Sequence, residues 1–160
     1  MARSGIIAIC DAAAAMLRDH SSDSSDEFIR SATIKSELFP AYQQSELESP
    51  VVDLHPLRRD SRSAARGPWQ YDPVIAIVAQ MQCPVTDGTF DKIAIANFVA
   101  LTTWVDETIQ TVCRRPGVSI AGHQWIESQI DPFYDGETLK SDHILRSLCM
   151  TTFRRFATAS

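Results

Sequence analysis

Residues 90–113 read FDKIAIANFVALTTWVDETIQTVC, and this stretch decides the predicted fold. Apolar side chains recur there at helical spacing on two faces. One face carries Ile93, Ala96, Ala100 and Trp104, and the other carries Phe98, Leu101, Val105, Ile109 and Val112. A helix that is apolar nearly all round has to be surrounded by other elements rather than lie on a surface. The stretch therefore predicts a central helix with neighbours packed about it.

Other segments of the chain also show helical spacing. The predicted helices cover residues 4–19, 26–44, 72–82, 120–130 (capped by Ser119) and 137–156. A strand is the competing prediction for residues 74–78, because β-branched side chains dominate there. The chain is thus expected to form one all-α domain over residues 1–160, with flexible segments near 20–26 and 45–68.

Composition excludes several functions. The chain has 160 residues, 44% of them hydrophobic, and a formal net charge of −5. Negative charge argues against general nucleic-acid binding, which relies on clustered Lys and Arg, and the basic cluster from Arg58 to Arg66 is interpreted as a solvated face. No uncharged run reaches the ~20 residues that a spanning helix needs. A soluble, intracellular protein without a membrane-spanning segment is expected.

Known catalytic and metal-binding motifs are missing from the sequence. It contains no Gly-rich phosphate loop, no nucleophile elbow, no HExxH helix and no CxxC pair. Ser119, His123 and Asp131 suggest a hydrolase, but the first two are as easily a helix cap and an exposed imidazole. The other three histidines show no ligand spacing, and the four scattered cysteines are expected to be buried thiols. The sequence predicts no enzyme activity, no cofactor and no metal.

Two short motifs resemble those of the Bcl-2 family of apoptosis regulators. Residues 87–93, DGTFDKI, are similar to the first homology motif of that family, which opens the central helix. Residues 124–127, QWIE, are similar to the second, in which Trp125 and Ile126 open a short helix. Both motifs occur in the family's order around the apolar helix, and the lack of a membrane anchor resembles viral members.

The resemblance implies an all-α Bcl-2-like bundle with a surface groove around a central hydrophobic helix. Such grooves accept an amphipathic death-motif helix, and the family is a known example of this binding mode. Carried over by position, Lys92 pairs with a carboxylate of the ligand. Asp91 stands where the family has a glycine, and its negative charge repels that ligand carboxylate. The groove residues implied are Val74, Val78, Met81, Thr89, Phe90, Asp91, Lys92, Ile93, Ala96 and Val99.

The function expected from the resemblance is a viral inhibitor of host apoptosis. It would sequester pro-apoptotic Bcl-2 family proteins of the host through their death-motif helices, in the cytoplasm and at the mitochondrial surface. An exposed apolar groove also favours a homodimer. The alternative is a helical viral structural, assembly or nucleic-acid-associated protein, for which the basic cluster from Arg58 to Arg66 is the best feature.

Overall fold

A five-stranded sheet forms the centre of the computed structural model, which describes residues 5–37, 42, 44–63 and 69–157. The strands lie in the order β1-β2-β3-β7-β6, and only the pair β1 and β2 is parallel. Their bounds are β1 Thr33–Ser36, β2 Val51–Ser63, β3 Trp69–Gln82, β6 Gln124–Ile130 and β7 Ile144–Ala157. A small hairpin follows β3 and consists of β4 Val85–Thr86 and β5 Thr89–Phe90.

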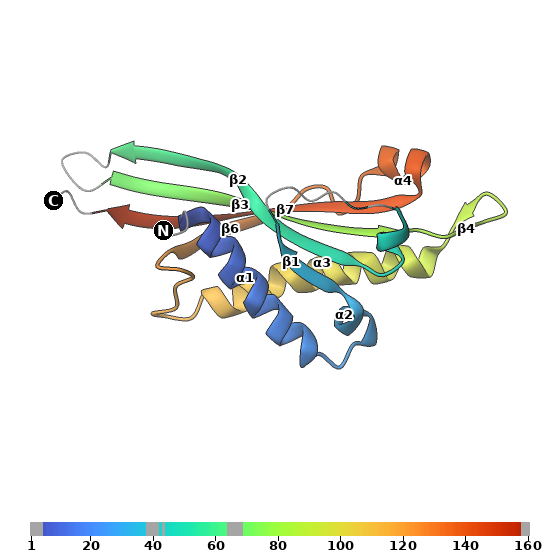
Figure 1. Ribbon diagram of the computed structural model, residues 1–160, viewed down its shortest axis with the longest axis horizontal. Coiled ribbons are helices and arrows are strands. Elements are labelled where there is room, and N and C mark those ends of the chain that lie inside the picture. Colours follow the sequence, from blue (N-terminus) through green and yellow to red (C-terminus); the bar gives the residue numbers. More distant parts are fainter. Residues whose placement is uncertain (1–4, 38–41, 43, 64–68, 158–160) are drawn as a thin grey trace.

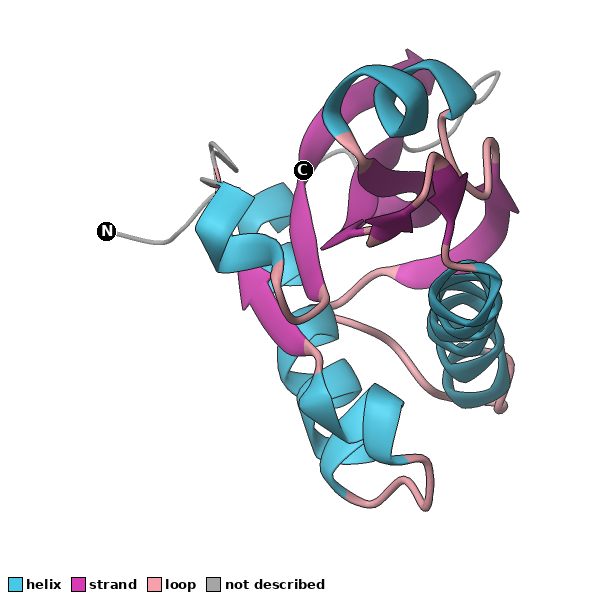
Figure 2. Ribbon diagram, turned by 90° about the vertical axis from the view of Figure 1, so that its right-hand side faces the viewer, coloured by secondary structure: helices cyan, strands magenta, loops and turns pink. Residues whose placement is uncertain are grey.

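Two long helices cover one face of this sheet (Figure 2). The helices of the described residues are α1 Gly5–Ser22, α2 Glu27–Ser31, η1 Gln44–Leu47, α3 Lys92–Cys113 and α4 Gly136–Asp142. α1 contacts β1, β2 and α3, and α3 contacts β6 and β7. Figure 1 shows that β2, β3 and β7 extend past the first turn of α1 at one end of the molecule. No helix of the described residues combines the length and hydropathy of a membrane crossing.

Two bulges interrupt the regular pairing of the sheet. The β2–β3 register shifts between Pro56 and Arg58, and the β6–β7 register shifts between Trp125 and Glu127. Bulges bend a strand and increase its twist. Pro56 lies beyond the residues of β2 that pair with β1, so it occupies an edge, where a missing N–H is tolerated. The first bulge also separates the buried residues at the start of β2 from Arg58, Arg59 and Asp60, which are exposed.

The core lies between the sheet and the helices α1 and α3. Alternate residues of β3 and β7 face the helices, as the two-residue period of a strand requires. The strand side chains in this core are Ile75, Ile77, Ala79, Met81, Leu145, Cys149 and Phe153. The helix side chains that meet them are Ile9, Ala13 and Leu17 of α1 with Phe98, Leu101, Val105 and Ile109 of α3. One continuous apolar cluster therefore joins both ends of the chain.

The predicted all-α Bcl-2-like bundle is wrong, because a mixed sheet lies where the helices were expected. The predicted central helix does form, as α3, but it is not surrounded. Its buried residues follow one face, while Ile93 is 73% exposed and Ala96 and Ala100 are also exposed. Alanine counts as apolar in a sequence pattern, yet exposing its small side chain to water costs little free energy. α3 is thus a one-sided helix on the sheet.

Three predicted helices are strands. β3 replaces the helix over residues 72–82, so the competing strand prediction was correct; its β-branched residues are buried on both faces, and such a run has no clear period. β6 occupies residues 124–130, and β7 occupies most of residues 137–156 after the short helix α4. Besides α3, only α1 matches its predicted helix closely, since α2 covers just five residues of the span 26–44.

The segments expected to be linkers contain regular structure. The stretch near 20–26 holds the end of α1 and a turn, and the stretch 45–63 holds most of η1 and all of β2. Residues 64–68 lie outside the described residues. The face of the sheet opposite the helices is partly covered by η1, which contacts β3 and whose Leu47 is 1% exposed. Buried side chains of β3, such as Val74 and Val78, face this side.

Candidate functional site

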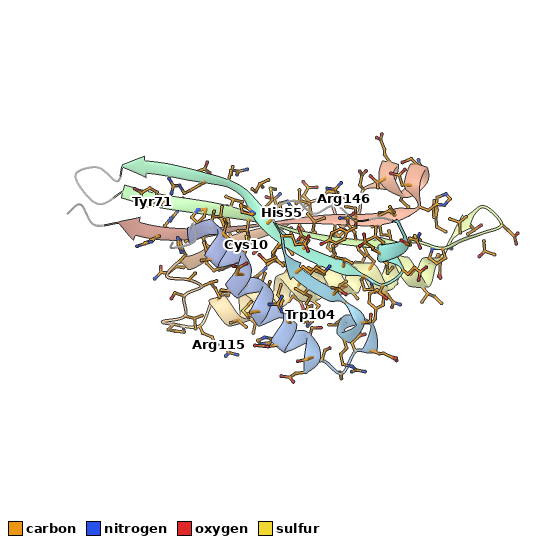
Figure 3. All side chains as sticks on the ribbon, viewed as in Figure 1. Cys10, His55, Tyr71, Trp104, Arg115 and Arg146 are labelled. Carbon is orange, nitrogen blue, oxygen red and sulfur yellow. The ribbon has the colours of Figure 1, made fainter. Side chains whose placement is uncertain are left out.

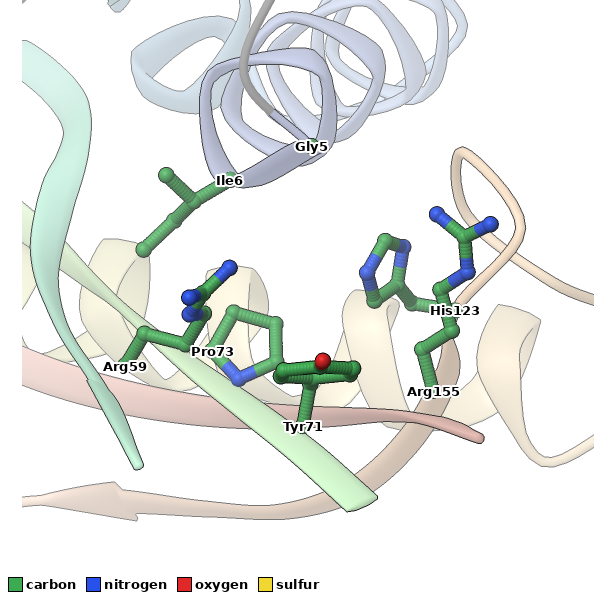
Figure 4. Close-up of a pocket in the computed structure, with 7 residues that line it drawn as sticks. All are labelled: Gly5, Ile6, Arg59, Tyr71, Pro73, His123 and Arg155. Carbon is green, nitrogen blue, oxygen red and sulfur yellow. The ribbon is translucent and has the colours of Figure 1, made fainter. Parts of the chain in front are cut away.

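A pocket lies at the end of the molecule where β2, β3 and β7 extend past the first turn of α1 (Figure 4). The ends of β2, β3 and β7 form its floor, the first turn of α1 its roof, and the turn before β6 one wall. Its volume is about 260 Å³. The residues that line it are Gly5, Ile6, Arg59, Tyr71, Pro73, His123 and Arg155. None of the described residues that line it is acidic.

Neighbouring arginines in the floor strands point to opposite faces of the sheet. Arg58 pairs with Asp60 at 3.5 Å, and Arg154 pairs with Asp72 at 2.9 Å. The next residues, Arg59 and Arg155, face the pocket, because successive side chains in a strand alternate. Across the described residues, neither of these two has a carboxylate partner. The pocket therefore holds two guanidinium groups whose charge no described carboxylate neutralises.

Tyr71 lies on β3 between the two strands that carry these arginines. The guanidinium carbon of Arg59 is 4.9 Å from the centre of the Tyr71 ring, a cation–π contact that orients the group and leaves its N–H donors free. Pro73 follows on the same face and is buried, and Ile6 of α1 lies opposite it across the open space (Figure 4). The pocket thus combines charged walls with an apolar floor and roof.

His123 completes the wall, and the turn before β6 fixes its orientation. Ala121 and Gly122 have φ of 48° and 77°, and Ile120 and His123 exchange two backbone hydrogen bonds at 2.8 and 2.9 Å. Nδ1 of His123 lies 2.8 Å from the carbonyl oxygen of Ala121, which can only accept, so Nδ1 carries a proton. Nε2 then points into the open centre of the pocket (Figure 4). His123 is 5% exposed, not an exposed imidazole as predicted.

The first turn of α1 passes directly over this imidazole. A Cβ atom built on Gly5 would lie 3.4 Å from Cε1 of His123, so a larger residue would crowd the ring. Gly5 is also the first residue of the 18-residue helix α1. The N–H groups of a helix start lack intrahelical partners and carry partial positive charge. The polar groups identified in this pocket are thus all hydrogen-bond donors, except Nε2 of His123 and the hydroxyl of Tyr71.

The groove residues implied by the resemblance do not form one surface. Val74, Val78 and Met81 all lie in β3 and are at most 5% exposed; the first two face away from the helices and the third faces toward them. Thr89 and Phe90 form β5, and the ring of Phe90 packs edge-on against His143.

The remaining implied groove residues lie at the start of α3. Asp91 is the N-cap, because its carboxylate accepts hydrogen bonds from the backbone N–H groups of Ile93 and Ala94. Lys92, Ile93 and Ala96 are exposed, and Val99 is half-buried. Asp91 therefore has a local structural role that accounts for it without a ligand.

The second implied motif lies in an edge strand rather than in a short helix. Trp125 and Ile126 belong to β6. The indole Nε1 of Trp125 donates to the hydroxyl of Ser128 at 2.9 Å, and the guanidinium of Arg114 lies 5.4 Å from its ring centre. The similarity of residues 124–127 to a helix-opening motif is therefore not matched by the local structure.

A buried carboxylate–imidazole pair lies on the opposite face of the sheet from the pocket. Nδ1 of His55 donates to Oδ2 of Asp53 at 2.8 Å, and both lie on β2, near the middle of the molecule (Figure 3). The carboxylate of Asp53 is fully buried, and its Oδ1 has no hydrogen-bond partner in the described part of the chain. Burial raises the pKa of Asp53, and the hydrogen bond from His55 opposes that rise. Apart from the i, i+2 spacing of the two residues, no sequence pattern indicated this pair.

Most pocket residues were not singled out by the sequence. Arg59 was included in a basic cluster interpreted as solvated, and His123 was considered only beside Ser119 and Asp131, which are both exposed. The adjacent arginine pairs, at residues 58–59 and 154–155, are the signal in the sequence that could have indicated the pocket. Within the described residues, no group of three or more His, Cys, Asp or Glu side chains could hold a metal ion. No protein family model matches the chain, and no curated protein sequence matches it.

Proposed function

We propose that the protein binds a small organic anion, carrying a carboxylate or a phosphate, in the pocket between α1 and the ends of β2, β3 and β7. The observation that carries this proposal is the pair Arg59 and Arg155, which face the cavity without a carboxylate partner among the described residues. Guanidinium groups match carboxylate and phosphate oxygens through paired N–H donors.

The apolar surfaces of the pocket favour an organic ligand over a bare inorganic ion. Ile6 and Pro73 present hydrocarbon on opposite sides of the cavity, and the ring of Tyr71 adds a flat surface. A volume of about 260 Å³ lies below the roughly 300–1,000 Å³ typical of drug-sized ligands. A ligand of metabolite size therefore suits this site better than a lipid chain or a peptide helix.

This fold removes the basis on which death-motif binding was expected. That expectation depended on a groove in an all-α bundle, and the residues implied for that groove are divided between the core, a hairpin and an exposed helix start. The alternative of a nucleic-acid-associated protein depended on the basic cluster, but β2 turns Arg58 and Arg59 to opposite faces, and Arg58 is paired with Asp60. Arg66 lies outside the described residues.

Isothermal titration calorimetry with benzoate and its neutral analogue benzamide tests the proposal. We expect benzoate to bind and benzamide to bind at least tenfold more weakly, because only the anion accepts charge-assisted hydrogen bonds. Arg59→Gln and Arg155→Gln should each weaken benzoate binding roughly 10–100-fold, the equivalent of about 1.5–3 kcal/mol for a charged hydrogen bond.

Arg146→Gln is the matched control for these variants. It removes the same charge from an exposed arginine far along the molecule from Tyr71 (Figure 3), so benzoate affinity should change less than twofold. Equal affinity for benzoate and benzamide, or equal losses in all three variants, would contradict the proposal.

A further inference from the structure

We infer that the natural ligand carries two anionic groups held apart, one bound at Arg59 and the other at Arg155, beside His123. This inference rests on the proposed function and narrows its ligand class to short dianions such as dicarboxylates. Both arginines line the same cavity, yet they come from different strands that are not neighbours in the sheet.

The strand order sets the separation of the two charges. β3 lies between β2 and β7, with Arg59 opposite Pro73 on one side and Arg155 opposite Tyr71 on the other. Adjacent strands are ~4.8 Å apart, so the two backbones that carry the arginines are roughly 10 Å apart. The contact of Arg59 with the Tyr71 ring keeps its guanidinium on its own side. Figure 4 shows Arg59 on one side of the cavity and Arg155 with His123 on the other.

His123 gives a ligand bound at Arg155 a hydrogen-bond acceptor as an additional contact. The residue His123 is only 5% exposed. Its Nδ1 is hydrogen-bonded to the carbonyl oxygen of Ala121, and its Nε2 is directed into the cavity. Nε2 has no hydrogen-bond partner in the described part of the protein. Nε2 is the unprotonated nitrogen of this tautomer and accepts a hydrogen bond, so a ligand hydroxyl beside the anionic group can donate to it. The Arg155 side of the pocket is therefore built as a binding position of its own.

Charge balance also requires two negative groups. The described part of the lining contains two guanidinium groups without a carboxylate partner and no carboxylate. A monoanion pairs with one arginine and leaves the other without an anionic partner. A compact dianion such as phosphate brings two charges but cannot reach both walls at hydrogen-bond distance. A short carbon chain between the two anionic groups fits the apolar surfaces of Ile6, Pro73 and Tyr71.

Calorimetric titration of the wild-type chain at constant ionic strength tests this inference with succinate, its monoamide succinamate, and inorganic phosphate. The monoamide keeps the size of succinate and lacks one charge. We expect succinate to bind at least tenfold more tightly than either of the others. In Arg59→Gln and in Arg155→Gln, succinate should fall to within about threefold of succinamate, because one of the two charged positions is then lost.

The outcomes separate this inference from the proposed function. If benzoate binds and succinamate binds as tightly as succinate, the protein binds single anions and the two-group inference is overturned. If phosphate binds most tightly, the two charges converge on one point, and the inference is again overturned. If no anion binds, benzoate included, the proposed function itself fails. Because the ligand is varied in the wild-type protein, a variant that fails to fold does not affect these results.

Discussion

Arg154 donates from Nε and Nη2 to the two carboxylate oxygens of Asp72, at 2.9 and 3.0 Å, across the pairing of β3 with β7. The next residue, Arg155, lies in the pocket and has no carboxylate partner among the described residues. One strand therefore carries a structural arginine and a ligand-facing arginine side by side. The difference follows from which face of the sheet holds an acid.

Asp72→Asn should lower the free energy of unfolding by about 1 kcal/mol, because it removes the charge from a two-point ion pair. This loss of free energy is small because both side chains are partly exposed to water. Asp60→Asn is the matched control, since its partner contact with Arg58 is long and both groups are more than half exposed. Urea unfolding should show a change of less than 0.5 kcal/mol for the control; equal losses in both variants would contradict the prediction.

Asp91→Ala should destabilise the protein by about 1 kcal/mol, because it removes the N-cap of α3. The carboxylate accepts the N–H of Ile93 at 2.9 Å and that of Ala94 at 3.3 Å. Asp91→Ser keeps a capping oxygen and should retain most of the stability. Circular dichroism during urea titration measures both variants, and a serine variant as unstable as the alanine variant would exclude the capping role.

Phe98→Ala should cost about 3–5 kcal/mol, because Phe98 is fully buried between α3 and the sheet. Ile93→Ala lies five residues earlier on the same helix but should cost less than 0.5 kcal/mol, since Ile93 is 73% exposed. Thermal unfolding compares the two. An Ile93→Ala loss similar to that of Phe98→Ala would mean that the start of α3 is buried against something, contrary to this fold.

None of the four cysteines should react quickly with a thiol reagent in the native protein at pH 8. All four are free and buried. Burial raises the pKa of Cys10 to about 12 and the pKa values of Cys113 and Cys149 to about 11, and it also raises the pKa of Cys83. The reactive thiolate is therefore scarce as well as shielded. Titration with Ellman's reagent should count four thiols only after unfolding in guanidinium, and a rapid native reaction would contradict the assignment.

Replacing Asp53 should change how stability depends on pH. Burial raises the pKa of Asp53 in the folded chain, with a further rise from Glu37, while His55 opposes it. A carboxyl with a raised folded pKa binds its proton more tightly when folded, so it loses stability as pH rises from its ordinary pKa through the folded one. Asp53→Asn should therefore gain stability relative to the wild type between pH 4 and pH 7, measured by urea unfolding at each pH. A difference that is constant with pH would contradict this.

Parts of the fold could be predicted from local pattern. α1 and α3 keep the helical period over 18 and 22 residues, so their existence is evident from the sequence. β7 was hidden because two of its inward positions are the small polar residues Ser147 and Thr151, which break the two-residue alternation of apolar side chains. Leu145, Leu148 and Cys149 then formed a helical stripe by coincidence of spacing.

The pocket could not be predicted, because its residues come from five separate parts of the chain. Arg59, Tyr71 and Arg155 meet only through the pairing of β2 with β3 and of β3 with β7. The pairing of β3 with β7 joins Tyr71 to Arg155, which are more than 80 positions apart in the chain, and no local pattern encodes that pairing. His123 depends further on a turn with two consecutive positive φ angles. The resemblance to Bcl-2 motifs rested on residues that here cap a helix and form an edge strand.

The extension of β2, β3 and β7 beyond α1 bears on how this protein can change during evolution. Six of the seven lining residues of the pocket are outside the apolar cluster that joins the sheet to the helices, and Ile6 only packs against its border. Substitutions of Arg59, Tyr71, His123 or Arg155 therefore leave that cluster intact. A lineage can exchange one ligand for another here, one side chain at a time, without first acquiring spare stability.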